Sequence, residues 1–344
     1  MIVSKGISIK RLFRWTGHHM VWLCALMALA AWGYEAGVLN IKLPWLPVSV
    51  IATAVAFYVG FKNNQAYDRM WEARKIWGAI VNSSRAWGMY ADGFVNDEFA
   101  KEEVSQAALI DIKKRLIYRH IAWLYTLREQ LLEPTSWEHS SQAGHIGRYA
   151  RLYQEYFGTG MVKNEVMEIH YDELLNKDDL HGIEKASNKA TQLINRQSRD
   201  LANLKRLGII DDFRHMEMEK MLYDLYQHQG KCERIKKFPL PRQFANLSRY
   251  FVGIFIMLLP FSMIPELLNM GQLGVYLSVP IAALVGWVYV VMEILGDYSE
   301  NPFQGMANDI PMLSICRTIE IDLREMLEER KLPSAIQAHN DILM

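Results

Sequence analysis

Five side chains between positions 165 and 173 are of the types that bind metal ions. They are Glu165, Glu168, His170, Asp172 and Glu173. Carboxylate and imidazole groups hold iron or manganese in helical bundles, where the binding helices carry a Glu-x-x-His turn. Neither glutamate lies three residues before the histidine, so the spacing favours a solvated helix face over a metal centre.

Other residues with ligating or catalytic potential are equally isolated. His18 and His19 stand at the start of an apolar run, and we interpret them as interfacial side chains rather than ligands. Cys24, Cys232 and Cys316 show neither a CxxC pair nor zinc-ligand spacing, which argues against a disulfide or zinc framework. The sequence also lacks the GxSxG, HExxH, P-loop and GxGxxG motifs. We therefore expect no enzyme activity, no metal and no cofactor.

A third set of residues has side chains of low reactivity and is notable only for its spacing, which fits one face of a helix. Thr53, Phe57 and Phe61 recur every four residues and share one face of a helix. They lie in the uncharged stretch Leu43–Phe61, which is about 28 Å long at ~1.5 Å per residue and can cross a bilayer. Lys62 follows, and the helix is expected to continue there into water. From periodicity alone, such an aromatic stripe predicts packing against a neighbouring helix.

The aromatic stripe lies within one of several apolar runs, which occur at both ends of the chain. They predict four membrane helices, at roughly 16–34, 43–61, 250–264 and 274–292. Basic residues cluster before the first run and after the second, whereas the loop between these two carries only Lys42. The positive-inside rule therefore predicts that both termini and the middle block, 63–245, are cytoplasmic.

The middle block is charged and rich in helix formers, and it shows no long alternation of apolar and polar residues. The sequence thus predicts an all-α protein, with helices at 179–207 and at 212–232, closing near Gly230, and a loosely held C-terminal end. Acidic and basic side chains balance at 38 each, so no global charge points to nucleic acid. The predicted segments are 1–62 with two membrane helices, 63–245 as a cytosolic helical domain, 246–294 with two further membrane helices, and 295–344 as a cytosolic C-terminal segment with one helix.

The sequence resembles the bestrophin family, specifically its bacterial branch. The resemblance covers both pairs of membrane helices and nearly the whole chain outside about 95–200. It is carried by GFKNNQAYDRMWEARKIWGAIVNSSR at 60–85, GKCERIKKFPLP at 230–241, MLLPFSMIPE at 257–266 and ENPFQGMANDIPMLSICRTIEIDL at 300–323.

The resemblance implies a homopentameric ion channel of the bacterial inner membrane, in contact with lipid and passing small inorganic ions. Each subunit would contribute four transmembrane helices and a large cytosolic helical region. By position, Thr53, Phe57 and Phe61 would form the narrow neck of the pore, which reverses the packing prediction. Ile210, or Ile209 if the alignment shifts by one residue, would form a second, cytosolic constriction. A narrow ring of phenyl groups offers no ligand to replace ion hydration and can act as a hydrophobic gate by dewetting.

Two alternatives stay open at the sequence level. Chloride is the family default, but bacterial relatives also include cation-conducting members. Phenyl edges in the neck would favour an anion, whereas phenyl faces would favour a cation. A protein of another class, a membrane-anchored helical scaffold or sensor without conductance, would fit the same organisation.

The chain also departs from the family pattern in two places. Thr53 stands where bestrophins carry a bulkier aliphatic residue, so the outer ring of the neck would be more polar. Animal members follow NPF with a dense acidic run that binds calcium, whereas residues 304–308 here are uncharged. With one ligating oxygen from each carboxylate, Asp297, Glu300 and Asp309 supply two or three ligands, fewer than the roughly six to eight that calcium takes, so calcium activation is not expected.

Overall fold

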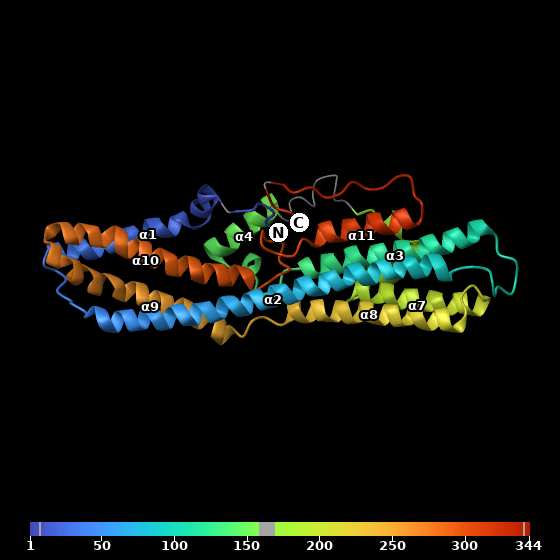
Figure 1. The fold of residues 1–344 in the computed structure, drawn as a ribbon, viewed down its shortest axis with the longest axis horizontal. Helices are drawn as coiled ribbons and strands as arrows, with labels where there is room; N and C mark the ends of the chain where they lie inside the picture. The colour runs from blue at the N-terminus through green and yellow to red at the C-terminus, as the bar shows by residue number, and fades with distance from the viewer. Residues whose placement is uncertain (7, 158–168, 340) are drawn as a thin grey trace. The chain divides into compact units, whose positions relative to one another are not determined.

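The computed structural model describes residues 1–6, 8–157, 169–339 and 341–344, and these residues are almost entirely helical (Figure 1). Within those ranges the only extended pairing consists of two isolated bridges near the chain ends. The all-α prediction is therefore confirmed. The elements are α1 (Ile9–Glu35), α2 (Trp45–Phe94), α3 (Gln106–Leu132), η1 (His139–Ser141), α4 (Gly144–Phe157), α5 (Tyr171–Leu174), α6 (Lys177–Glu184), α7 (Lys189–Leu207), α8 (Asp212–Lys237), α9 (Arg242–Leu267), η4 (Leu268–Met270), α10 (Gln272–Ser299) and α11 (Met312–Met326).

The chain forms two compact units, and the 50-residue helix α2 contributes to both. We call residues 4–69 and 239–300 the apolar unit. Residues 1–3, 70–238 and 301–344 form the bundle unit. These ranges describe packing alone, and the functional division of the chain at 62, 245 and 294 stays a prediction.

In the apolar unit, α10 packs against both α1 and α9 (Figure 1). Its core includes Leu23, Val59, Phe255 and Leu259, all at most 1% exposed. Among the described residues, three helical stretches are long and apolar enough to cross a membrane: α2, 242–270 and α10. These stretches identify a membrane protein. Histidine and tryptophan side chains lower the mean hydropathy of α1, so the predicted fourth span stays a proposal.

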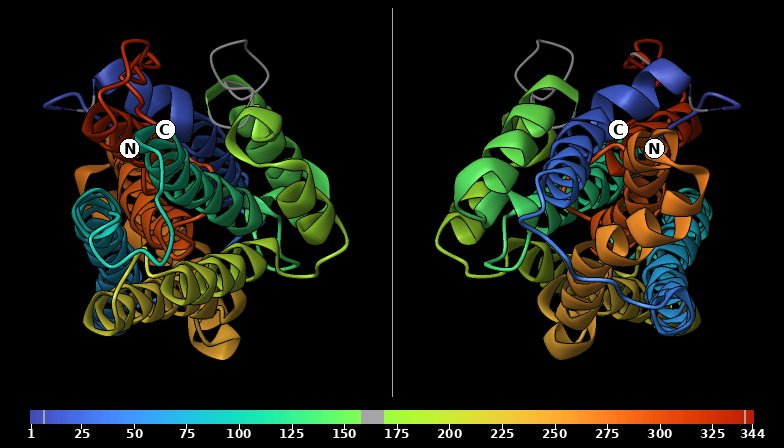
Figure 2. Two further views of the ribbon diagram at one scale, coloured as in Figure 1. Left: turned by 90° about the vertical axis from the view of Figure 1, so that its right-hand side faces the viewer. Right: turned by 90° about the vertical axis from the view of Figure 1, so that its left-hand side faces the viewer.

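The bundle unit is built around α3, which is buried continuously from Leu116 to Arg128. Helices α7 and α11 pack against it, and α8 lies beside α7 (Figure 2). Trp77 and Trp87 are fully buried in its core, and Trp123 is 1% exposed. This unit therefore holds a large aromatic core of its own.

Two helix boundaries differ from the predictions because tertiary contacts outweigh local signals. Helix α8 runs through Gly230 to Lys237 and ends before Pro239. A glycine inside a helix costs about 1 kcal/mol, and the apolar burial of Cys232 and Ile235 in the next turns offsets that cost. The predicted helix 179–207 is interrupted, because the Asn188 side chain accepts the Thr191 N–H and starts α7 afresh.

The prediction that the last dozen residues are loosely held was wrong for residues 342–344. Ile342 is 1% exposed and forms an antiparallel bridge with Ile2. The Ser314 N–H also donates to the Met344 carbonyl at 2.7 Å. Backbone pairing and apolar burial thus hold this segment against the bundle unit, and composition does not reveal such pairing.

Candidate functional site

The three residues of the predicted neck occupy an uncovered face of α2. Phe57 is 66% exposed and Phe61 is 60% exposed, and Thr53 is exposed as well. In a soluble protein two phenyl rings would normally be covered, because fully burying such a side chain is worth about 1.5–3 kcal/mol. The structure therefore brings the three side chains to one face, and no other helix in the described part of the chain packs over that face.

The other side of the same helix is fully packed. Val48, Val55 and Val59 are between 0% and 4% exposed and contribute to the core of the apolar unit. Tyr58 also faces the protein, since its hydroxyl donates to the Phe244 carbonyl at 3.2 Å and its ring packs against Phe251. Helix α2 is therefore held on one side, which fixes the direction in which its aromatic stripe faces.

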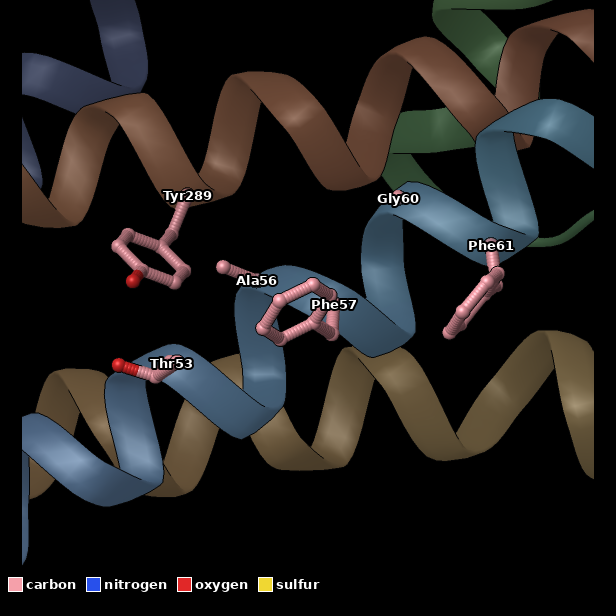
Figure 3. A pocket seen from close by; sticks show the side chains of 6 residues that line it. All are labelled: Thr53, Ala56, Phe57, Gly60, Phe61 and Tyr289. Carbon is pink, nitrogen blue, oxygen red and sulfur yellow. The ribbon is translucent and has the colours of Figure 1, made fainter.

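The uncovered face contains a hollow of about 380 Å³. Its lining comes from α2, with one contribution from α10: Thr53, Ala56, Phe57, Gly60, Phe61 and Tyr289. Figure 3 shows the ring of Tyr289 extending from α10 toward Thr53 and Ala56. Its hydroxyl donates to the Ala52 carbonyl at 3.0 Å, and its ring lies 4.5 Å from that of Phe255. Sequence periodicity along α2 did not reveal Tyr289, because it belongs to another helix.

The only hydroxyl of the stripe is already engaged within α2. The Thr53 Oγ1 donates to the Ser49 carbonyl at 2.9 Å. Its proton is thereby directed along the helix, which leaves the oxygen lone pairs toward the uncovered side. Thr53 is thus less able to donate to an anion than its residue type suggests.

The predicted second constriction lies in the turn between α7 and α8. Gly208 ends α7 in the left-handed conformation, at φ 78°, and the Ile209 N–H donates to the Leu204 carbonyl at 3.0 Å. The side chains of Ile209 and Ile210 are 3% and 1% exposed and contribute to the core of the bundle unit. Leu207 and Phe213, which flank this turn, are 56% and 82% exposed. Ile210 as a constriction stays a prediction.

The environment of Lys62 differs from the prediction, which placed this residue in water. Although α2 continues past it without interruption, the side chain is fully buried rather than in water. Its Nζ lies 2.5 Å from Glu293 Oε1 of α10. In the sequence, Lys62 and Glu293 are the first charges after the uncharged stretches 43–61 and 267–292, but nothing in the sequence shows that they meet. Two such charges at the same membrane level can pair.

The residues first considered as metal ligands do not assemble in the described part of the chain. Glu165 and Glu168 lie outside the described residues. His170, Asp172 and Glu173 are exposed around the short helix α5. Residues 1–6, 8–157, 169–339 and 341–344 contain no group of three or more metal-binding side chains. Asp309 instead accepts the N–H groups of Gln304 and Met306, at 2.8 and 3.0 Å.

Comparison with known proteins relates this chain to bestrophins and to proteins named as anion channel-forming. A family model described as bacterial/fungal bestrophin protein matches residues 6–325. The voltage-dependent anion channel-forming protein YneE of Escherichia coli (strain K12) is 24% identical over 339 residues, which span 95% of this chain and 94% of that protein. The voltage-dependent anion channel-forming protein mll4386 of Mesorhizobium japonicum is 24% identical, over 95% of this chain and 88% of that protein.

A solved structure shares the fold. The crystal structure of a bacterial bestrophin homologue from Klebsiella pneumoniae superposes with a TM-score of 0.70 at 20% sequence identity. The superposition covers 91% of this chain and 99% of the other. At this identity the likeness concerns the fold alone.

Proposed function

Since the chain belongs to the bacterial/fungal bestrophin family, we propose that it is an ion channel that passes small anions across a membrane. The curated relatives are named as anion channel-forming proteins, which supports anion passage. The observation that carries the proposal is the uncovered stripe of Thr53, Phe57 and Phe61 on a membrane helix whose opposite face is fully packed.

In the proposed assembly, five copies of α2 surround one central pore. Each level of the neck would then carry five identical side chains, with threonine at the outer level and phenylalanine at the two inner levels. Five phenyl rings around a narrow opening exclude water until the ring widens, which is the basis of a hydrophobic gate. Anion passage requires that ring edges, which carry partial positive charge, face the pore. Ring faces would favour a cation, which is the competing selectivity.

The other exposed apolar side chains of the spans need a different environment. Examples are Ile254 and Met257 on α9 and Leu284 on α10, each more than half exposed. We propose that these residues contact lipid acyl chains in the bacterial inner membrane. The basic clusters that flank the first two apolar runs support cytoplasmic termini and a cytoplasmic segment 63–245. External labelling of a cysteine introduced at Tyr223, which is 60% exposed, would overturn this topology.

The most direct test of the function is the reversal potential of the purified protein in planar bilayers with asymmetric potassium chloride. An anion channel gives a reversal potential close to the chloride equilibrium value. A value close to the potassium equilibrium potential would establish the cation alternative. The absence of current from pentameric protein would refute the channel and favour a scaffold.

We also propose that opening does not require calcium. Segment 304–308 carries no acidic side chain, and both N–H contacts of Asp309 are made to one of its carboxylate oxygens. Currents should therefore persist when a calcium chelator is present on both sides. Loss of current with the chelator and its recovery with micromolar calcium would contradict this proposal.

A further inference from the structure

Lys62 is a charged residue on the packed side of α2. It follows Val55 and Val59 at seven and three residues' distance, so it continues their buried stripe. Its side chain is 0% exposed, and that of its partner Glu293 is 10% exposed. Charged residues inside a membrane protein are costly unless they are paired, and in general they mark functional positions. Neither the neck stripe nor the proposed lipid contacts uses this pair.

The pair belongs to a polar contact that joins three helices. The Ser248 hydroxyl of α9 lies 2.9 Å from the same Glu293 Oε1 and 2.9 Å from the Ala245 carbonyl, so its one proton is shared between these two acceptors. One residue after Lys62, the Asn63 amide donates to the Met292 carbonyl of α10 at 3.1 Å. Gly296 permits the close approach of α10 there, because a Cβ at that position would lie 2.1 Å from Asn63 Oδ1. Helices α2, α9 and α10 are therefore tied together at one level.

This level coincides with the inner end of the phenyl stripe. Phe61 and Lys62 are adjacent in sequence and therefore point about 100° apart around the helix axis. Phe61 is 60% exposed, while Lys62 is held by Glu293. Rotating or sliding α2 enough to withdraw Phe61 from its face would pull the ammonium away from the carboxylate. An unpaired buried charge is strongly unfavourable, so such motion is opposed.

We propose that Lys62, Glu293 and Ser248 are positioning residues for the neck: they fix the rotation and depth of α2, and thereby the placement of the Phe57 and Phe61 rings. This inference rests on the proposed channel function. The simpler explanation is that the pair only stabilises helix packing. The two explanations differ in one respect, because a positioning role changes ion selectivity in channels that are still correctly assembled.

Glu293→Gln is the first test, since it keeps the size of the side chain and removes the charge. The expected result is a change of about twofold or more in the chloride-to-potassium permeability ratio or in unit conductance, measured on pentamers isolated by size. Exchanging the two charges, Lys62→Glu with Glu293→Lys, should return the ratio toward that of the parent because the pair can form again. Unchanged ratio and conductance in assembled Glu293→Gln channels would overturn the proposal.

A matched control is available in the bundle unit. Lys236 and Glu138 form a comparably buried pair, with Nζ and Oε1 2.6 Å apart and side chains 6% and 2% exposed. Glu138→Gln should lower thermal stability as a broken buried pair does, but leave the permeability ratio unchanged. An equal shift in this control would mean that any buried charge defect disturbs conduction, and it would contradict the positioning role.

Ser248→Ala keeps the test decisive if Glu293→Gln fails to assemble. It removes one hydrogen bond to Glu293 and leaves the ion pair, so a smaller shift of the ratio in the same direction is expected. An unchanged ratio in this variant would overturn the proposal. Phe57→Ala distinguishes failure of the positioning role from failure of the channel function. If Phe57→Ala shifts the permeability ratio and the Glu293 and Ser248 variants do not, only the positioning role is refuted. If the parent protein passes no current, the channel function itself is refuted.

Discussion

The two halves of α2 place the same kind of side chain in opposite environments. Phe57 and Phe61, in the apolar unit, are 66% and 60% exposed, whereas Trp77 and Trp87, in the bundle unit, are fully buried. All four lie on one continuous helix, so secondary structure does not decide the difference. It arises from the side of the helix on which each residue lies. Trp77 and Trp87 lie on the side that packs into the core of the bundle unit, whereas Phe57 and Phe61 lie on the side that the apolar unit leaves uncovered. An aromatic stripe that the chain leaves uncovered is available to other copies of the chain or to a pore.

The buried ion pairs of the two units also differ in where they lie. In the bundle unit, Arg119 binds Asp179 and Asp200 at 2.8 and 2.9 Å, which ties α3 to α6 and α7. In the apolar unit, the Lys62–Glu293 pair lies at the end of the uncharged stretch of α2. Polar networks in the bundle unit thus stabilise a self-contained core, whereas the Lys62–Glu293 pair of the apolar unit begins one residue from Phe61 of the neck. Mutations should separate these roles.

The largest effect on stability is expected for Trp87→Ala. The side chain is fully buried and its Nε1 donates to the Leu116 carbonyl at 3.3 Å. Truncation leaves a cavity and removes this hydrogen bond, and should lower the free energy of unfolding by about 3–5 kcal/mol. Denaturant unfolding followed by circular dichroism measures the change. Met89→Ala, at a 58% exposed position of the same helix, should cost less than about 1 kcal/mol. Equal costs would mean that the contrast along α2 is wrong.

Ile210→Ala should follow, because this proposed constriction residue is 1% exposed in the core of the bundle unit. The cavity should cost about 2–5 kcal/mol, whereas Leu207→Ala, at a 56% exposed site, should cost far less. The permeability of large anions relative to chloride tests the constriction separately. If that ratio stays at the parent value, Ile210 is a core residue only and the second constriction lies elsewhere.

The pH dependence of the bundle unit should show a further, smaller effect at His120. Burial lowers the pKa of this imidazole to about 3, from an ordinary value of 6.5. Below pH 6.5 the unfolded chain binds a proton that the folded protein does not, so stability falls as the pH falls. Between pH 6.5 and 5 the loss should be about 2 kcal/mol.

His120→Phe isolates this contribution, because it keeps a ring between Trp87 and Trp123 and cannot titrate. The comparison with the parent is needed, since Asp309 acts in the opposite direction. Burial raises the pKa of Asp309 to about 7, so its contribution to stability is lost as the pH rises through 7. Parallel stability curves for parent and His120→Phe between pH 7 and 5 would show that His120 is not kept neutral by the fold.

Sequence reasoning recovered the parts of the structure that depend on local pattern. Hydropathy located the spans on α2, α9 and α10, and four-residue spacing placed Thr53, Phe57 and Phe61 on one face. It could not assign Lys62 to the interior, because a lone lysine after an apolar run normally marks the end of a membrane span. Its environment depends on Glu293, 231 residues further along the chain. The burial of Ile210 likewise depends on the packing of the bundle unit and has no local signal.

The smallest effect on stability and the largest on conduction are expected for Phe57→Ala, which tests the central claim most directly. If this side chain faces a pore, its removal should cost less than about 1 kcal/mol, compared with about 3–5 kcal/mol for a packed phenylalanine. Removing five rings from one level should widen and wet the neck, which raises unit conductance and relaxes selectivity. The measurement is single-channel recording in planar bilayers of protein whose pentameric state and thermal midpoint match those of the parent. Intact pentamers with larger, less selective currents are the predicted result. A variant that dissociates in detergent, or conducts as the parent does, would contradict the assignment of α2 as the pore-lining helix.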